Sequence, residues 1–216
     1  MPYHGNVRVG GPADLRDLAD LQITKIAVGP MDNNAYLLRS PQTGETLLID
    51  AAAEPDRLLG VVEDGIDKVV TTHRHSDHWQ ALAAVVDATG ARTAAHALDA
   101  PELPVAVDDL LEDGASIAVG NARLEVIHLV GHTPGSIALL YDDPRERAHL
   151  FTGDSLFPGG PGKTTNPADF TSLMDDLEDK VFSRLPDETW VYPGHGKDTT
   201  LGVERPHLAE WRARGW

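Results

Sequence analysis

Thr-His-Arg-His-Ser-Asp-His, residues 72–78, places three imidazoles and one carboxylate within seven positions, directly after a short run that ends in Val69 and Val70. A solvated surface segment has no need of three histidines, and a protein core tolerates an aspartate only where it has partners. Imidazole nitrogen and carboxylate oxygen are the donors that zinc and related divalent metals prefer. The stretch therefore predicts a metal site at the end of a strand.

Three motifs further along the chain each offer one more potential ligand. They are Gly-His-Thr-Pro-Gly-Ser with His132, Thr-Gly-Asp-Ser with Asp154, and Tyr-Pro-Gly-His-Gly with His195. Each motif follows a hydrophobic run and contains glycine, which permits a sharp turn where a strand ends. Ligands at the ends of separate strands converge on one edge of a sheet, where α/β enzymes usually keep their chemistry.

The spacing of these ligands predicts two neighbouring metal positions. His73 and His75 are two residues apart, so on an extended backbone they point to the same side and can hold one ion together with His132. The ligands predicted for the second position come where the chain begins to coil and from the last motif: Asp77, His78 and His195.

Asp154 is predicted to bridge the two ions, because its carboxylate has two oxygens. Two ions about 3.5–4 Å apart can share a hydroxide, lower the pKa of water from about 15.7 towards 7, and polarise a carbonyl. Spacing leaves two roles open for Asp77, that of a ligand and that of an acid–base group beside the hydroxide. We therefore take Asp77 and Asp154 as the candidate catalytic residues. Asp50, after the run at residues 47–49, is a candidate for orienting a ligand.

Composition limits the classes of protein to consider. The chain has 216 residues, no cysteine and a formal net charge of −16. Its length predicts a single domain, residues 1–216. The lack of cysteine excludes disulfides, iron–sulfur clusters and thiolate nucleophiles. The negative charge argues against a nucleic-acid partner and favours a small-molecule substrate. We find no signal peptide and no apolar run of roughly 20 residues, so we expect a cytoplasmic protein without a membrane partner.

Hydrophobic patterning predicts strands that arrive in two groups, with helices among them. This order indicates two sheets with helices packed outside. The expected strands are at residues 23–28, 35–39, 45–49, 68–72, 92–97, 117–119, 124–130, 137–141 and 189–191. The expected helices are at 55–62, 79–90, 170–185 with Asp169 as N-cap, and 200–212 with an interruption near Pro206. Residues 101–114 and 157–167 are expected to be an acidic connection and a loop.

The order H-x-H-x-D-H, G-H-T, G-D and G-H-G resembles the metallo-β-lactamase-fold hydrolase superfamily, and the resemblance extends from about Ile23 to Glu204. It implies an α/β protein with a four-layer αββα sandwich and a metal site at one edge of the two sheets. It implies the same ligand sets as the spacing: one set of three histidines, a second set, and a bridging aspartate. Residue by residue, these are His73, His75 and His132, then Asp77, His78 and His195, then Asp154.

Within that superfamily the chain is most similar to glyoxalase II-like (hydroxyacylglutathione hydrolase-like) proteins, including short forms that lack a C-terminal helical domain. The resemblance rests on Gly-Asp-Ser-Leu-Phe at 153–157, Gly-Lys-Thr at 162–164, and Tyr-Pro-Gly-His-Gly-Lys-Asp-Thr-Thr at 192–200. It implies that Lys163 binds a substrate carboxylate. Thr165 stands where the longer enzymes have tyrosine, so esters of another small thiol, or a broad thioesterase activity, fit equally well.

The sequence thus predicts a binuclear metallohydrolase that cleaves a thioester or related acyl bond by attack of a metal-bound hydroxide. It predicts two divalent metal ions, zinc foremost, with iron and manganese also suited to nitrogen and oxygen donors. The alternatives are a mononuclear iron persulfide dioxygenase, which uses two histidines and one aspartate, and a lactamase or lactonase of the same fold. A nuclease is disfavoured by the charge, and a vestigial binding module would need a lost ligand.

Three residues near the predicted ligands in the sequence have simpler interpretations. Trp79 belongs to the apolar stripe of the helix that follows, which favours core packing over a role in the pocket. Arg74 alternates with the histidines, so a structural ion pair and substrate binding are both open. His128 is expected to be a packed histidine on a strand.

Overall fold

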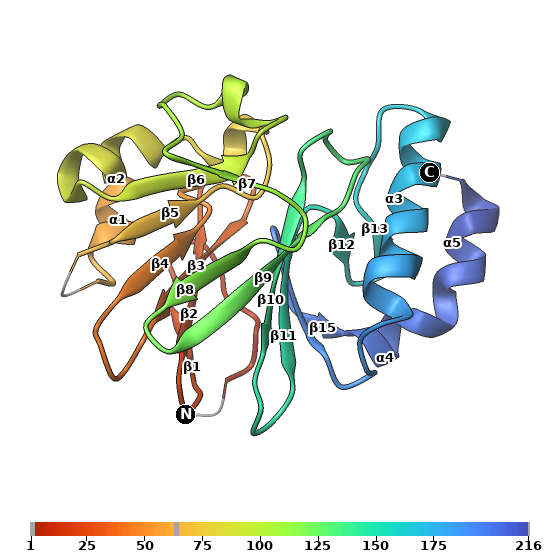
Figure 1. Ribbon diagram of the computed structural model, residues 1–216, viewed down its shortest axis with the longest axis horizontal. Helices are drawn as coiled ribbons and strands as arrows, with labels where there is room; N and C mark the ends of the chain where they lie inside the picture. Colours follow the sequence, from red (N-terminus) through yellow and green to blue (C-terminus); the bar gives the residue numbers. More distant parts are fainter. Residues whose placement is uncertain (1–2, 63–64, 216) are drawn as a thin grey trace.

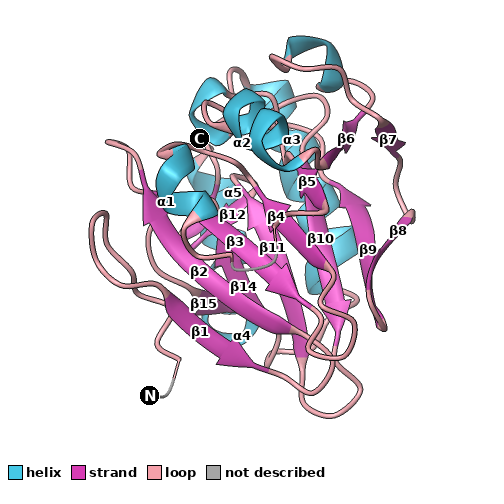
Figure 2. Ribbon diagram, turned by 90° about the vertical axis from the view of Figure 1, so that its left-hand side faces the viewer, coloured by secondary structure: helices cyan, strands magenta, loops and turns pink. Residues whose placement is uncertain are grey.

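The computed structural model describes residues 3–62 and 65–215, and these form four layers (Figure 1). Two β-sheets face each other, α1 and α2 cover one of them, and α3 and α5 cover the other. Figure 2, viewed from the side of α1 and α2, shows both helices in front of the strands. The predicted αββα sandwich is therefore confirmed. Residues 1 and 2, part of the segment in which we predict no signal peptide, lie outside the described residues.

The first sheet, as far as the chain is described, contains seven strands in sequence order. Neighbours from β1 to β4 are antiparallel and those from β4 to β7 are parallel, so the connections after β4 cross over as in other α/β sheets. The strands are β1 (Asp14–Asp17), β2 (Gln22–Val28), β3 (Asn33–Arg39), β4 (Thr46–Ile49), β5 (Lys68–Val70), β6 (Arg92–His96) and β7 (Asp109–Leu111).

The second sheet has the strand order β15-β14-β11-β10-β9-β8 within the described residues. Its pairs are antiparallel except for β11 with β14. The strands are β8 (Ser116–Val119), β9 (Ala122–His128), β10 (Ile137–Asp142), β11 (Ala148–Gly153), β14 (Trp190–Pro193) and β15 (Thr199–Thr200). A separate small hairpin is formed by β12 (Leu156–Phe157) and β13 (Gly160–Pro161).

The helical segments lie outside the sheets or in the connections. The α-helices are α1 (Pro55–Leu59), α2 (Leu82–Thr89), α3 (Pro167–Asp176), α4 (Leu201–Glu204) and α5 (Leu208–Arg214). Short 3₁₀ turns are η1 (Ser76–His78), η2 (Ala100–Glu102) and η4 (Arg205–His207), and a π-helical stretch, η3 (Leu177–Phe182), continues α3. None of the helices in the described part of the chain has the length and apolar character that a bilayer crossing requires.

Buried hydrophobic side chains fill the three spaces between the four layers. The inner cluster joins both sheets and includes Tyr36, Phe151 and Tyr192. One outer cluster packs the second sheet against α3, η3 and α5, and the other packs the first sheet against α1 and α2. Burial of apolar surface on both faces of each sheet explains why so many strands have continuous rather than alternating hydrophobic residues.

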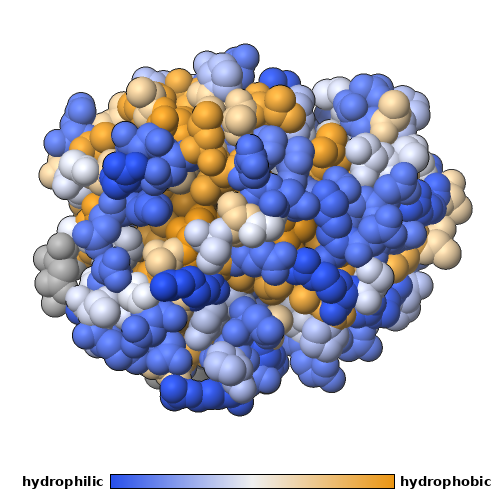
Figure 3. Space-filling view, in the orientation of Figure 1, coloured by the Kyte–Doolittle hydropathy of each residue, from blue (hydrophilic) through white to orange (hydrophobic). Residues whose placement is uncertain are grey.

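The surface is mainly hydrophilic on the face shown in Figure 3, with hydrophobic residues gathered around β6 and β7. Leu98 and Leu110, which belong to this part of the chain, are 56% and 60% exposed. Because β7 is the last strand of its sheet in the described part of the chain, one side of this strand is without a described neighbouring strand.

Several element boundaries differ from prediction. Helix α3 begins at Pro167, and its N-cap is Asn166 rather than Asp169, because the Asn166 side chain accepts hydrogen bonds from the backbone N–H groups of Ala168 and Asp169. The predicted acidic connection contains η2 and β7, and the predicted loop at 157–167 contains part of the small hairpin. The interruption near Pro206 is confirmed by the 3₁₀ turn between α4 and α5.

Candidate metal centre

The segment that carries the histidine cluster follows β5 and is fixed by Asp50 at the end of the neighbouring strand β4. Asp50 has a left-handed backbone (φ 59), which aspartate tolerates better than most residues. Its carboxylate accepts hydrogen bonds from the Thr72 N–H at 2.7 Å, the Thr72 hydroxyl at 2.8 Å and His78 Nδ1 at 2.8 Å. The predicted contact of Asp50 with a site histidine is therefore present.

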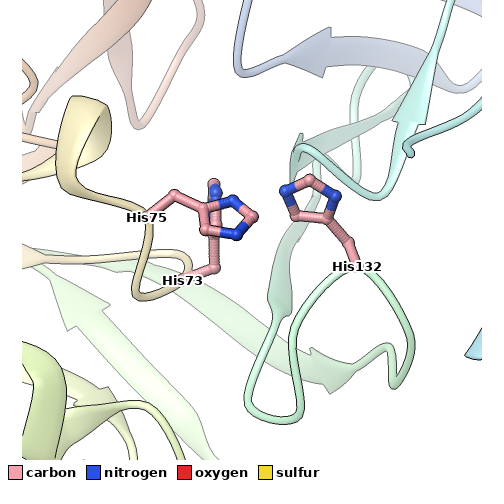
Figure 4. Close-up of side chains that lie close together, drawn as sticks. All are labelled: His73, His75 and His132. Atoms are coloured by element: carbon pink, nitrogen blue, oxygen red, sulfur yellow. The ribbon is translucent and has the colours of Figure 1, made fainter. Parts of the chain in front are cut away.

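His73, His75 and His132 face one another, as Figure 4 shows. One ring nitrogen from each lies within 4.8 Å of the others. The first two come from the segment after β5 and the third from the connection between β9 and β10, so the group spans both sheets. The structure brings together the three residues predicted for the first metal position.

The outer nitrogens of two of these rings have oxygen partners, while the inner nitrogens have none. His132 Nδ1 donates to the backbone carbonyl of Lys163 at 2.7 Å, and His73 Nδ1 lies 3.1 Å from the hydroxyl of Thr72. The Nε2 atoms of His73 and His132 are buried without a hydrogen-bond partner. Buried polar atoms normally have partners, so two neighbouring buried nitrogens without one are suited to bind a metal ion.

Asp77, His78 and His195 form a second group beside the first. The Nε2 atoms of His78 and His195 are 3.2 Å apart, and Asp77 Oδ2 lies 3.5 and 3.3 Å from them. The outer nitrogen of each imidazole again forms a hydrogen bond. His78 Nδ1 donates to Asp50, and His195 Nδ1 donates to the carbonyl of Met31 at 2.9 Å. The predicted ligands of the second position thus also converge.

Asp154 lies between the two groups at the end of β11. Its Oδ1 is 3.3 Å from His78 Nε2, and its Oδ2 is 3.4 Å from His195 Nε2 and 3.6 Å from His132 Nε2. One carboxylate therefore faces histidines of both groups, as the bridging hypothesis requires.

Two glycines allow the backbone to approach this carboxylate closely. A Cβ added at Gly194 would collide with Asp154 Oδ1 and with the ring of His78. A Cβ added at Gly162 would collide with the backbone oxygen of Asp154. Glycine is therefore required beside His195 and Lys163 because a larger residue would collide with Asp154, and it also permits a turn there.

Burial keeps the first group of histidines neutral. It lowers the pKa of His73 well below its usual range, and it lowers the pKa of His132 and His75 as well. A neutral imidazole is the form that donates a lone pair to a metal.

The second group is ionised. Burial opposes a charge on His78, but the carboxylates of Asp50 and Asp154 outweigh it and raise the pKa of His78 to about 10. Asp154 and Asp77 likewise outweigh burial and raise the pKa of His195 to about 10. The hydrogen bond with His195 lowers the pKa of Asp77, and the histidines hold the pKa of Asp154 well below its usual range despite burial. The carboxylates are therefore negatively charged.

The donor set fits divalent metal ions. It consists of imidazole nitrogens and ionised carboxylate oxygens, with outer-nitrogen hydrogen bonds to carboxylate and carbonyl oxygens that set the ring orientations.

A cavity of about 310 Å³ adjoins the first group of histidines. Its wall includes His75, His132, Arg74, Thr165 and Asp169. Lys163 lies nearby, because its carbonyl contacts His132, but its side chain is exposed and makes no hydrogen bond or ion pair with the residues that the structure describes.

Three residues near the predicted ligands, Trp79, Arg74 and His128, pack against neighbouring side chains or pair with them. Trp79 packs against the outer cluster and donates to the carbonyl of Arg74 at 2.8 Å. Arg74 Nε is 4.0 Å from Asp99, a weak ion pair, while the residue also lines the cavity. His128 stacks on His96 with ring centroids 3.9 Å apart, which agrees with a packed histidine.

Sequence reasoning missed two residues near the site. Asn33 donates to Asp77 Oδ2 at 2.8 Å, and Asp99 contacts both segments that hold the first group of histidines. Both are distant in the sequence from the residues that they contact. The available signal for Asn33 was its position three residues after Pro30 of the predicted Gly29-Pro30 turn.

The comparisons agree with this geometry. A model of the metallo-β-lactamase superfamily matches residues 28–195, which include every residue of both groups. The chain belongs to this superfamily. The superfamily uses divalent metals, and the histidine and aspartate clusters can bind them.

Individual relatives are similar over most of the chain. A hydroxyacylglutathione hydrolase of Polaromonas sp. strain JS666 is 38% identical over 166 residues, which cover 76% of this chain and 62% of the relative. The chain thus spans less than two thirds of the length of this curated relative.

Two solved structures have the same fold and are more than 25% identical in sequence to this chain. ETHE1 from Myxococcus xanthus has a TM-score of 0.77 and 28% identity, covering 88% of this chain and 84% of its own. TTHA1623, solved in a di-iron-bound form, has a TM-score of 0.67 and 33% identity, covering 84% of this chain and 96% of its own.

Proposed function

We propose that this protein is a binuclear metallohydrolase of the glyoxalase II-like type, which cleaves a thioester or related acyl bond of a small molecule. The observation that supports this most is the convergence of seven nitrogen and oxygen donors from both sheets on one small region. The similarity to a hydroxyacylglutathione hydrolase supports an acyl thioester as the bond that is cleaved.

We propose two divalent metal ions as cofactors, held by His73, His75 and His132 and by Asp77, His78 and His195, with Asp154 between them. Zinc is the first candidate, and iron or manganese also suit these donors. The di-iron form of TTHA1623 supports a two-metal site of this general kind. Bound ions would lower the pKa of a water molecule towards about 7 and polarise the scissile carbonyl.

Asp77 and Asp154 are the proposed catalytic residues. Asp77 Oδ2 is held by the amide of Asn33 at 2.8 Å, so the carboxylate has a fixed direction from which to orient a water molecule by accepting a hydrogen bond from it. Asp154 directs one oxygen to His78 and the other to His132 and His195, and so fixes the relative positions of the two groups.

We propose that the substrate enters through the cavity beside the first group of histidines. A volume of about 310 Å³ suits a small acyl compound. Lys163 is the proposed substrate-binding residue, because its exposed ammonium group has no partner among the described residues and its backbone contacts His132. The net charge of −16 favours a small-molecule substrate over a nucleic acid. The single domain at residues 1–216, the cytoplasmic location and the lack of a membrane partner stay predictions.

A mononuclear iron persulfide dioxygenase is a second candidate, because two histidines and one aspartate suffice for it. His73, His78 and Asp154 form such a set, with ligand atoms within 4.8 Å of one another. This candidate leaves the other donors without a function, whereas the hydrolase uses all of them. A lactamase or lactonase would use the same two groups and differs only in the acyl bond that it cleaves.

The proposal is tested by assaying the purified protein on a panel of acyl thioesters, lactones and β-lactams, with oxygen uptake measured on a persulfide. We expect thioester hydrolysis that is lost on chelation and restored by zinc, without oxygen uptake. Oxygen consumption with one iron per chain would establish the dioxygenase instead. Turnover of no thioester at any metal loading would contradict the hydrolase proposal.

A further inference from the structure

Asp99 is a buried carboxylate outside the predicted ligand set. It follows β6, directly precedes η2, and is 1% exposed. A buried carboxylate is costly unless hydrogen-bond donors satisfy it, so its partners indicate what it does.

The donors to Asp99 come from two segments on opposite sheets. The backbone N–H of Arg74 donates to Oδ2 at 3.0 Å, and the backbone N–H of Gly135 donates to Oδ1 at 2.9 Å. The hydroxyl of Thr133 also donates to Oδ2. Each oxygen of this one side chain is thus occupied by the connection between β9 and β10, and Oδ2 also holds the segment after β5.

These two segments carry the three histidines of the first group. Arg74 lies between His73 and His75, and Thr133 directly follows His132. Each histidine of the group is therefore adjacent in the sequence to a residue that donates a hydrogen bond to Asp99. A further backbone hydrogen bond, from the Ile137 N–H to the Thr72 carbonyl at 3.0 Å, joins the same segments from another side.

The connection around Asp99 is closely fitted. A Cβ added at Gly135 would collide with the Asp99 side chain and its backbone nitrogen. Thr133 and Ser136 support the turn from within, because their hydroxyl oxygens are 2.7 Å apart and the Thr133 N–H donates to Ser136 at 3.1 Å. Displacement of the carboxylate would therefore break the three hydrogen bonds by which Asp99 links the two segments.

We propose that Asp99 is a positioning residue that sets the distance between His132 and the pair His73 and His75, and thereby the metal affinity of the first position. The inference rests on the metal site proposed above but not on its substrate. Partners outside the ligand shell typically change metal affinity by about 10- to 100-fold, and an effect of this size is expected here.

The test is a zinc titration of the chelated full-length protein against a competing chelator, with histidine NMR signals assigning each step to a group of rings. Asp99→Asn keeps the size of the side chain but presents an amide donor to backbone N–H groups. We expect the affinity of the first position to fall about 10- to 100-fold. The signals of His78 and His195 should respond to zinc as in the wild type.

Asp108→Asn is the control, at an exposed carboxylate with the same kinds of donor. Asp108 also accepts a backbone N–H, from Thr93 at 2.8 Å, and the Thr93 hydroxyl at 3.1 Å, but these contacts join β6 to the segment before β7. We expect both zinc affinities to match the wild type in this variant. If Asp99→Asn does not fold, Thr133→Val removes one donor to Asp99 and should weaken the first position by a smaller factor.

The possible failures are distinguishable. Wild-type protein that binds no zinc would contradict the metal-site proposal itself. Wild-type protein that binds two ions, together with an unchanged first position in Asp99→Asn or Thr133→Val, would overturn the role of Asp99. Equal weakening of both positions in Asp99→Asn and Asp108→Asn would overturn it too, because the effect would then be a general loss of stability.

Discussion

Both groups of donors can bind a metal ion, but the histidines of one group are neutral and those of the other are protonated. His73, His75 and His132 are held neutral by burial, and the inner nitrogens of His73 and His132 have no hydrogen-bond partner among the described residues. His78 and His195 are charged, because carboxylates surround them and raise the pKa of each to about 10. The first group is therefore ready to accept a cation, whereas the second must lose protons first.

The difference follows from where the carboxylates lie. Asp50, Asp77 and Asp154 each lie between 2.8 and 3.5 Å from His78 or His195 of the second group, whereas in the first group Asp154 lies 3.6 Å from His132. A metal ion would therefore be attracted more strongly by carboxylates at the second position. At the first position it would have fewer protons to displace from the histidines. Substitutions and changes of pH should therefore affect the two positions differently.

The largest effect is expected from removing the residue that both groups have in common. Asp154→Asn takes away the charge that faces His78, His132 and His195, so we expect zinc affinity to fall at both positions. Thioester hydrolysis should fall by more than about 100-fold, since partners outside the ligand shell alone change affinity or activity about 10- to 100-fold. Metal content and kcat/KM measure the two effects, and retention of both ions with full activity would contradict a bridging role.

A matched pair of substitutions separates the two positions. His132→Ala should remove the ion at the first position and leave the second position intact. His195→Ala should remove the ion at the second position and leave the first intact. Each variant should then bind one zinc ion instead of two. We expect both variants to lose hydrolysis, because the reaction is proposed to need both ions. Elemental analysis after gel filtration gives the stoichiometry. Loss of both ions in either variant would show that the positions do not form independently.

The pH dependence of zinc binding should differ between the positions. At neutral pH zinc must displace protons from His78 and His195, so affinity at the second position should rise with pH until about 10, where both rings are neutral in the free protein. Affinity at the first position should be nearly constant above neutral pH, because burial lowers the pKa values of its histidines. Titrations at several pH values check this, and equal slopes would contradict the contrast.

The same pKa values fix the sign of a stability change in the metal-free protein. The raised pKa values of His78 and His195 mean that folding favours their protonated forms. Their contribution is complete below the unfolded pKa of about 6.5 and is lost as the pH rises through about 10. Chelated protein should therefore unfold at lower urea concentration as the pH rises across this range, and His195→Ala should reduce the dependence.

The smallest effect on activity is expected from substituting Lys163, which belongs to neither group of donors. Lys163→Gln should raise KM by about tenfold for a thioester with a free carboxylate and leave kcat nearly unchanged, because a hydrogen bond to a charged group contributes about 1.5–3 kcal/mol. A neutral thioester should show no change in KM. Arg145→Gln, which removes an exposed charge whose partner is Asp20, is the control. Equal effects on both substrates would remove Lys163 from substrate binding.

The sequence was informative wherever ligands lie close together or beside glycine. The spacing of residues 72–78 and the three glycine-flanked motifs predicted which side chains would converge, because strand ends at one edge of a sheet are neighbours in space. The contact of Asp50 with His78 was predictable for the same reason, since β4 and β5 pair side by side.

Other features depend on contacts that local patterns do not encode. Asp99 contacts Gly135 across 36 positions, and nothing in the neighbouring sequence distinguishes this acidic residue from a solvated one. The N-cap of α3 was misplaced by three residues because Asn166 and Asp169 are both good caps, and Pro167 at the first helical position favours Asn166. The opposite charge states of the two groups follow from carboxylate positions that the structure alone provides.

The most direct test of the two-position account is thioester hydrolysis measured while zinc is added stepwise to chelated protein. The account predicts two ions bound per chain, with full activity reached only when the second is bound. Full activity with a single ion, or activity that persists in the chelated protein, would contradict it.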